Sequence, residues 1–175
     1  MDELYAIRGA AERLAGELAI ASATVDWGRA EAHLDAMGRC AEVGDYDGFA
    51  EVDLEFHTEF FVNSGNSRLL GLWRQYQPTF ATLLGITNAQ DADLHPSYRD
   101  HLQLIDRARA GDREGLAAAL ADHLDGSHRR LSRTVAARSA RRASAQLSST
   151  VAWVVGASGA VGGVPPTCSA LEPAR

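Results

Sequence analysis

The sequence predicts an all-α protein, an antiparallel helical bundle of about six to seven helices. Apolar residues recur at three- and four-residue steps along most of the chain, which is the period of amphipathic helices. Glycine and aspartate residues occur between these segments, where helices are expected to end and begin. No segment has a strand pattern of useful length, and 175 residues suffice for one domain with a sizeable core.

The first predicted helix spans residues 2–22 and begins at Asp2. We expect its apolar stripe to be the buried face: Leu4, Ile7, Ala11, Leu14 and Leu18. Arg8 lies at the edge of this stripe. The simplest interpretation of Arg8 is a surface ion pair with Glu12, worth a few tenths of a kcal/mol. A second helix is predicted over residues 26–43, after Asp26 and before Gly44.

The third predicted helix, residues 45–63, places two metal-capable side chains beside its own buried face. Asp45 is expected to cap it, and the apolar stripe is Phe49, Val52, Phe56 and Phe60. Asp53 and His57, four residues apart, share one face next to this stripe. A carboxylate beside a core needs a partner. The pattern assigns the solvent side to Glu51, Glu55 and Glu59.

The remaining helices follow from turn signals. The residues around Asn66 form a turn, and the next helical pattern runs to Gly85, with a kink or break expected at Pro78. After a loop over residues 86–96, Pro96 suits the start of the helix that carries His101. The last helix opens after Gly111, carries His123, and is predicted to end near Arg142. We therefore expect one domain over residues 1–142 and a low-complexity, disordered tail over residues 143–175.

Charge and cysteine content argue against several functions. The net charge is −6, and residues 1–125 are strongly acidic, which argues against a nucleic-acid surface on the body of the protein. The two cysteines, Cys40 and Cys168, are far apart and form neither a disulfide framework nor a metal motif. No signal sequence or membrane-spanning segment is evident, so we expect a cytoplasmic protein without membrane association.

Four side chains on the predicted inner faces suggest a metal site. His101 and His123 each lie on the apolar stripe of their helix, as Asp53 and His57 do on theirs. Three imidazoles and one carboxylate from facing helices suit a divalent ion such as Zn²⁺, Ni²⁺ or Mn²⁺. Core histidines that merely pack are the alternative, and the spacing alone leaves both interpretations open.

Five short segments, in order, carry a family resemblance: Glu3–Arg8 with Glu12, Asp53–His57, Ser64–Asn66, His101–Ile105 leading to Ala110–Asp112, and Asp122–Leu124. With them, the chain from Asp2 to about Leu131 resembles the effector-binding C-terminal (FCD) domain of FadR-type GntR-family transcription regulators. The resemblance implies that the metal ligands are Asp53, His57, His101 and His123. It also implies that Arg8 faces the carboxylate of a small effector, and it adds Asn66 to the ligand-binding candidates.

The expected function is therefore metal-dependent sensing of a small carboxylate by a regulator domain, which acts as a homodimer and is not an enzyme. The family's N-terminal winged helix-turn-helix has no counterpart before Asp2, so we expect no sequence-specific DNA binding by this chain alone. Two alternatives are a metal-dependent enzyme and a purely structural helical interaction protein. Against the enzyme, the pattern leaves no inward glutamate as a general base.

Overall fold

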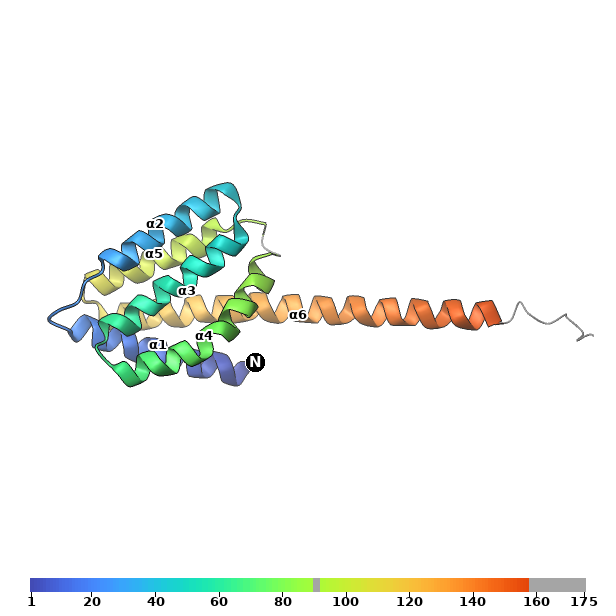
Figure 1. Cartoon of the computed structure of the whole chain (residues 1–175), viewed down its shortest axis with the longest axis horizontal. Coiled ribbons are helices and arrows are strands. Elements are labelled where there is room, and N and C mark those ends of the chain that lie inside the picture. The colour runs from blue at the N-terminus through green and yellow to red at the C-terminus, as the bar shows by residue number, and fades with distance from the viewer. Residues whose placement is uncertain (90–91, 158–175) are drawn as a thin grey trace, which may run out of the picture. The chain divides into compact units, whose positions relative to one another are not determined.

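The computed structural model describes residues 1–89 and 92–157, and within these ranges it contains helices and no strands (Figure 1). The predicted all-α bundle is thus confirmed. The helices are α1 (Asp2–Ala21), α2 (Gly28–Val43), α3 (Tyr46–Asn63), α4 (Ser67–Asn88), α5 (His95–Arg109) and α6 (Arg113–Ala157).

The predicted helix boundaries at the two Gly-Asp pairs have a clear local cause. Gly44 ends α2 with a positive φ of 69°, a conformation that favours glycine, and Gly111 has the same φ before α6. The aspartate that follows each glycine caps the next helix. Asp45 accepts a hydrogen bond of 3.0 Å from the backbone N–H of Gly48, as expected for an N-cap.

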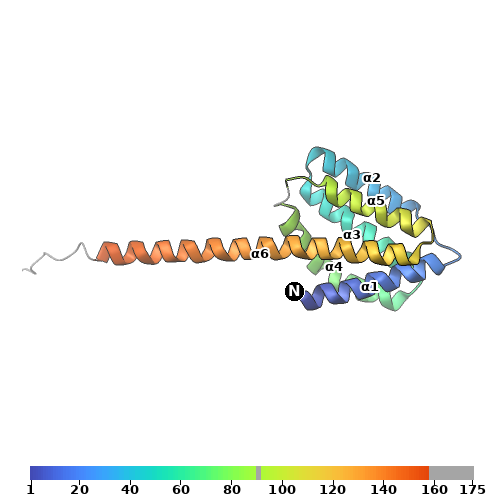
Figure 2. The same cartoon turned by 180° about the vertical axis from the view of Figure 1, so that it is seen from behind.

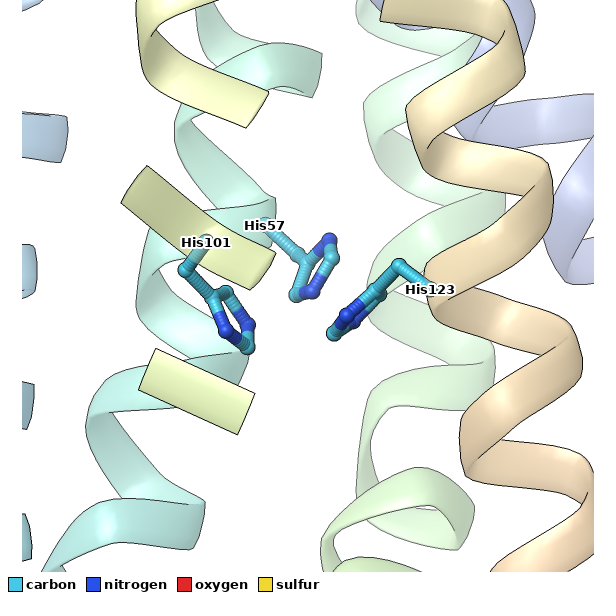
Figure 3. A group of neighbouring side chains, drawn as sticks. All are labelled: His57, His101 and His123. Atoms are coloured by element: carbon cyan, nitrogen blue, oxygen red, sulfur yellow. The ribbon is translucent and has the colours of Figure 1, made fainter. Parts of the chain in front are cut away.

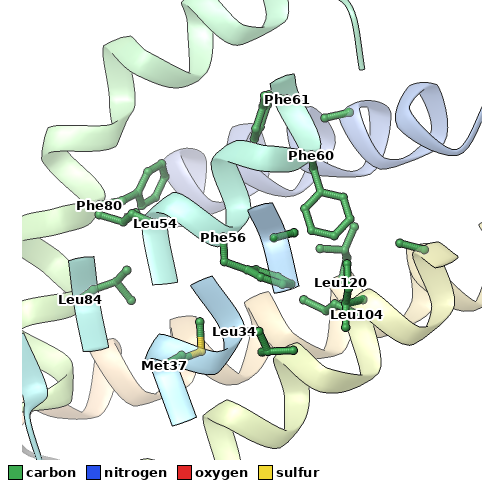
Figure 4. Close-up of a cluster of buried hydrophobic side chains, with 14 of the residues drawn as sticks. Leu34, Met37, Leu54, Phe56, Phe60, Phe61, Phe80, Leu84, Leu104 and Leu120 are labelled. Atoms are coloured by element: carbon green, nitrogen blue, oxygen red, sulfur yellow. The ribbon is translucent and has the colours of Figure 1, made fainter. Parts of the chain in front are cut away.

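Helix α3 occupies the centre of the bundle and packs against α1, α2 and α4, while α2 packs against α5. Its phenylalanines are almost fully buried and form much of the apolar core (Figure 4). The core also includes leucines from α4, α5 and α6 and Met37 from α2. Because α3 is surrounded on several sides, polar residues on it are also forced into the interior.

Helix α1 lies against the first part of α6 and runs antiparallel to it (Figure 2). The hydroxyl groups of Tyr5 and Ser127 are 3.0 Å apart at one end of this contact. At the other end, a Cβ on Gly16 would lie 2.9 Å from a methyl carbon of Leu116. Only glycine fits there without displacing the leucine, so this residue allows the two helices to approach closely.

The prediction for the buried face of α1 was wrong. Ile7 and Leu14, assigned to the core, are 41% and 42% exposed. The helix instead buries a face that carries Tyr5, Arg8, Glu12, Ala15 and Ala19. The apolar stripe lies at the edge of this face, where Leu4, Ala11 and Leu18 are only partly buried. The polar pair is drawn inward because it meets partners on α3, as described below.

Two predicted helix ends also differ from the structure. Helix α4 continues past the predicted end at Gly85 to Asn88. Pro78 lies inside this helix and does not interrupt it, and Figure 1 shows that the helix bends. Helix α6 continues past Arg142 to Ala157, and the strong helix former alanine recurs in this segment. The predicted tail therefore overlaps a helix over residues 143–157, and its remainder, residues 158–175, lies outside the described residues.

The chain divides into two compact units, Met1–Val135 and a second one that begins at Ala136. The predicted domain boundary after residue 142 stays a prediction. In the part of the chain that the structure describes, none of the helices combines the length and the apolar character needed to cross a membrane.

The cap at Asp45 provides a test of these local signals. Replacing Asp45 with Ala removes the acceptor for the Gly48 N–H, and we expect a loss of about 1 kcal/mol in the free energy of unfolding. Asp47→Ala, in the first turn of the same helix, is the matched control and should cost much less. Urea denaturation of both variants measures the difference, and equal losses would contradict the capping role.

Candidate metal centre

Three histidines from three different helices meet in the core. His57 comes from α3, His101 from α5 and His123 from α6, and Figure 3 shows their rings converging. One possible ligand atom from each lies within 4.8 Å of the others. All three side chains are buried. The structure therefore brings together the three histidines that the sequence selected, in an arrangement that could hold a metal ion.

The Nδ1 atoms of two rings face oxygen atoms. His101 Nδ1 lies 2.7 Å from the backbone carbonyl oxygen of Ser97, which can only accept a hydrogen bond. His57 Nδ1 lies 2.8 Å from Oε2 of Glu12, although the two atoms are not aligned as a full hydrogen bond. A proton on Nδ1 leaves the Nε2 lone pair free, and this is the atom through which such histidines commonly bind metals.

Asp53 lies beside two of these free nitrogen atoms. Its Oδ2 is 3.3 Å from His101 Nε2, and its Oδ1 is 3.8 Å from His57 Nε2. Both Nε2 atoms and Oδ1 of Asp53 are buried polar atoms without a hydrogen-bond partner. Buried polar groups are normally paired, and a cation among these three atoms would satisfy all of them. The residues present thus fit a divalent metal ion.

The third histidine lies near a carboxylate that the sequence pattern did not reveal. His123 Nδ1 lies 3.9 Å from Oδ2 of Asp100, a half-exposed residue one position before His101. Burial, followed by repulsion from His101, lowers the pKa of His123 to about 4. The ring is therefore neutral at pH 7, which is the form that binds a metal.

The carboxylate of Asp53 is ionised in spite of its burial. Burial alone would raise its pKa, but the nearby His101, His57 and Arg8 outweigh that effect and hold the pKa well below its usual range. An ionised carboxylate together with imidazole nitrogens is the donor set that borderline divalent metals prefer.

Arg8 and Glu12 form an ion pair, but a buried one, contrary to the first interpretation of these residues. Arg8 Nε lies 2.6 Å from Glu12 Oε1, and the two residues are 2% and 1% exposed. The guanidinium carbon is 4.7 Å from the ring centre of Phe80 and 5.7 Å from that of Trp73. Both Nη atoms of Arg8 are buried without a hydrogen-bond partner. Removing one member of such a pair commonly costs about 3–5 kcal/mol.

Glu59 is buried, contrary to the prediction, and Asn66 lies at the start of α4. Glu59 was assigned to the solvent side of α3, but it is only 2% exposed and lies 3.2 Å from Arg29 of α2, which compensates its charge. Asn66 is exposed and caps α4 by accepting a hydrogen bond of 3.1 Å from Leu69 N–H. Its role in ligand binding stays a prediction.

Glu12 is the main residue that sequence reasoning missed. The signal that could have revealed it is the spacing of Tyr5, Arg8, Glu12, Ala15 and Ala19, which repeats at three and four residues like any helix face. The stripe of larger apolar residues on α1 masked this polar alternative.

Comparison with known families agrees with the fold and with the order of the motifs. Residues 3–126 match the FCD domain. The chain belongs to the FCD domain family. This FCD domain is also 30% identical over 122 residues to a probable D-xylose utilization operon transcriptional repressor from Paenarthrobacter nicotinovorans. The alignment covers 70% of this chain and 54% of that protein, so the chain spans about half of the relative's length.

The fold has a solved counterpart in E. coli McbR/YncC. The two structures superpose with a TM-score of 0.70 and 21% sequence identity, over 77% of this chain and 65% of that one. At this identity the likeness shows the fold alone. The family match confirms the expected resemblance to the effector domain of GntR-type transcription regulators.

The lowered pKa of His123 predicts a specific pH dependence of stability. Between pH 6.5 and about 4 the unfolded chain binds a proton at His123 that the folded chain does not, so stability falls as pH falls through this window. In chelator-treated protein, the urea midpoint should be lower at pH 5 than at pH 7. His123→Leu should weaken this decline, whereas His33→Leu, outside the cluster, should keep it. An unchanged decline in His123→Leu would contradict the assignment.

Proposed function

We propose that this FCD domain is the metal-containing, small-carboxylate-sensing part of a GntR/FadR-type transcription regulator. The proposed metal ligands are Asp53, His57, His101 and His123, and the ion is Zn²⁺, Ni²⁺ or Mn²⁺. When bound, the metal supplies a Lewis acid for an oxygen atom of the effector. The proposal includes a cytoplasmic homodimer and leaves base-specific DNA contacts to other parts of the regulator.

The observation that carries the carboxylate assignment is the guanidinium of Arg8. It is buried, its Nε is used by Glu12, and its Nη1 and Nη2 have no partner. A buried arginine with two free nitrogens matches the two oxygens of a carboxylate. Glu12 contacts both Arg8 and His57, so the guanidinium group of Arg8 lies next to the proposed metal centre. We propose that a single small acid contacts both.

The balance of buried charge also favours an acid. Arg8 carries one positive charge, while Glu12 and Asp53, both with lowered pKa values, carry one negative charge each. A divalent ion changes the net charge of this buried group from −1 to +1. One carboxylate then brings it to zero, and uncompensated charge in a core is costly.

The relative from Paenarthrobacter nicotinovorans suggests which acids to test. It is named as a probable repressor of a D-xylose utilization operon. We extend this sugar context to the present domain and propose sugar acids and related hydroxy acids as the first effector candidates.

An enzyme is the weaker alternative. The structure does contain inward glutamates, contrary to the expectation from the sequence, and Glu12 lies next to the histidine cluster. Burial opposes ionisation of Glu12, but attraction to Arg8 and His57 prevails and lowers its pKa to about 2. Such a carboxylate is a weak base, so it is poorly suited to general base catalysis at pH 7. The family relationship also points to a regulator.

Metal binding is tested by titrating chelator-treated protein with Zn²⁺, Ni²⁺ and Mn²⁺. We expect one equivalent of a preferred ion per chain and a rise in melting temperature of about 10 °C at a thousandfold excess over Kd. His101→Ala and His123→Ala should lose most of this rise. His33→Ala should show the full rise, because His33 contacts only Glu59 among the ion pairs of the described residues. Comparing each variant with and without metal removes the effect of lost packing. An identical rise in all three variants would contradict the proposed site.

Effector binding is tested by a thermal-shift series with D-xylonate and D-gluconate on metal-loaded protein. Stabilisation should grow with acid concentration, by about 2.7 kcal/mol at a hundredfold excess over Kd. Arg8→Lys should weaken it, because an ammonium group cannot form paired hydrogen bonds with a carboxylate. Arg13→Lys, in the exposed pair with Glu17, is the matched control and should behave like the wild type. Full stabilisation by the acids in Arg8→Ala would refute the proposed effector site.

A further inference from the structure

Glu12 contacts both Arg8, the proposed carboxylate-binding residue, and His57, a proposed metal ligand. Each of its carboxylate oxygens faces one of these two residues. Oε1 lies 2.6 Å from Arg8 Nε on the same helix, and Oε2 lies 2.8 Å from His57 Nδ1 on α3. All three side chains are almost completely buried. His57 Nδ1 and Glu12 Oε2 are both buried and form no aligned hydrogen bond, so their 2.8 Å contact is what compensates each of them.

We infer that Glu12 is a positioning residue that holds His57 in the tautomer able to bind a metal and, with its other oxygen, aims the Arg8 fork at the ligand. The inference rests on the metal-binding function proposed above and deepens it.

The tautomer follows from the chemistry of the contact. An ionised carboxylate can only accept hydrogen bonds, so the favourable arrangement places the proton of a neutral His57 on Nδ1. The lone pair is then on Nε2, on the side of Asp53, whose Oδ1 is 3.8 Å away. With the opposite tautomer, two lone pairs would face each other across 2.8 Å, and Nε2 would carry a proton. That form cannot bind a metal through Nε2.

The same carboxylate determines what Arg8 offers. Because Nε of Arg8 donates to Oε1 of Glu12, one edge of the planar guanidinium is fixed in place. Both Nη atoms then remain available to another hydrogen-bond acceptor. The rings of Phe80 and Trp73 lie near this group and restrict its other orientations. Glu12 therefore links the acid-binding group to the metal-binding group through a single side chain.

Glu12→Gln tests the inference because it keeps the shape and changes one acceptor into a donor. With the amide oxygen towards Arg8 Nε–H, its NH₂ group faces His57 and can only donate, so the proton of His57 must move to Nε2. We expect Zn²⁺ affinity, measured by chelator competition, to fall about 10- to 100-fold. In metal-stripped protein, ¹⁵N NMR of the His57 ring should change from the Nδ1–H to the Nε2–H tautomer.

Glu17→Gln is the matched control, because Glu17 forms the same four-residue pair with Arg13 on the exposed side of α1. It should leave both the affinity and the tautomer unchanged. If Glu12→Gln does not fold, the comparison is made between Arg8→Met and the double variant Arg8→Met/Glu12→Gln. In this pair no buried guanidinium loses its counterion on the second substitution, and the same changes in affinity and tautomer are expected.

The outcomes separate this inference from the proposed function. A wild-type protein that takes up no metal refutes the function, while the tautomer in stripped protein still decides the role of Glu12. Unchanged affinity and tautomer in Glu12→Gln overturn the positioning role alone. Weaker affinity without a change of tautomer also overturns it, because the effect would then be the loss of a negative charge.

Discussion

The buried chain of Arg8, Glu12 and His57 is the interaction on which the rest of this structure depends. A guanidinium and a carboxylate inside an apolar core are tolerated only if each finds a partner with good geometry. That requirement fixes which face of α1 turns inward and ties this helix to α3. The buried face of α1 therefore contains charged residues, although a neighbouring face of this helix carries a stripe of larger apolar residues.

The apolar core provides the environment in which these polar groups act. Phe56 meets the rings of His57 and His101 edge-on, with centroid distances of 5.6 and 5.1 Å, and so helps to exclude water from the cluster. In such surroundings electrostatic attraction is stronger than in water, and an unpaired atom is more costly. The free Nε2 atoms and the free Nη atoms of Arg8 are thus the parts of the core that gain most from a ligand.

The location of the proposed site inside the bundle has a consequence for sensing. Its side chains come from α1, α3, α5 and α6, so a ligand that binds them stabilises the packing of four helices at once. Binding free energy at such a site adds to the stability of the folded domain by mass action. Occupancy can in this way be converted into a change in the rigidity or arrangement of helices, which is what a regulator domain has to transmit.

The sequence by itself determined the helices, most of their boundaries and the inward position of Asp53 and the three histidines. These features follow from local periodicity and from turn residues such as Gly44, which act within a few residues of the chain. The tertiary structure alone decided the burial of Glu12 and Glu59, because their partners lie on other helices. It also decided which oxygen atom lies nearest to Nδ1 of each imidazole ring, which the histidine spacing does not reveal. Periodicity shows which residues share a face, but a charged residue is buried only where another helix compensates its charge.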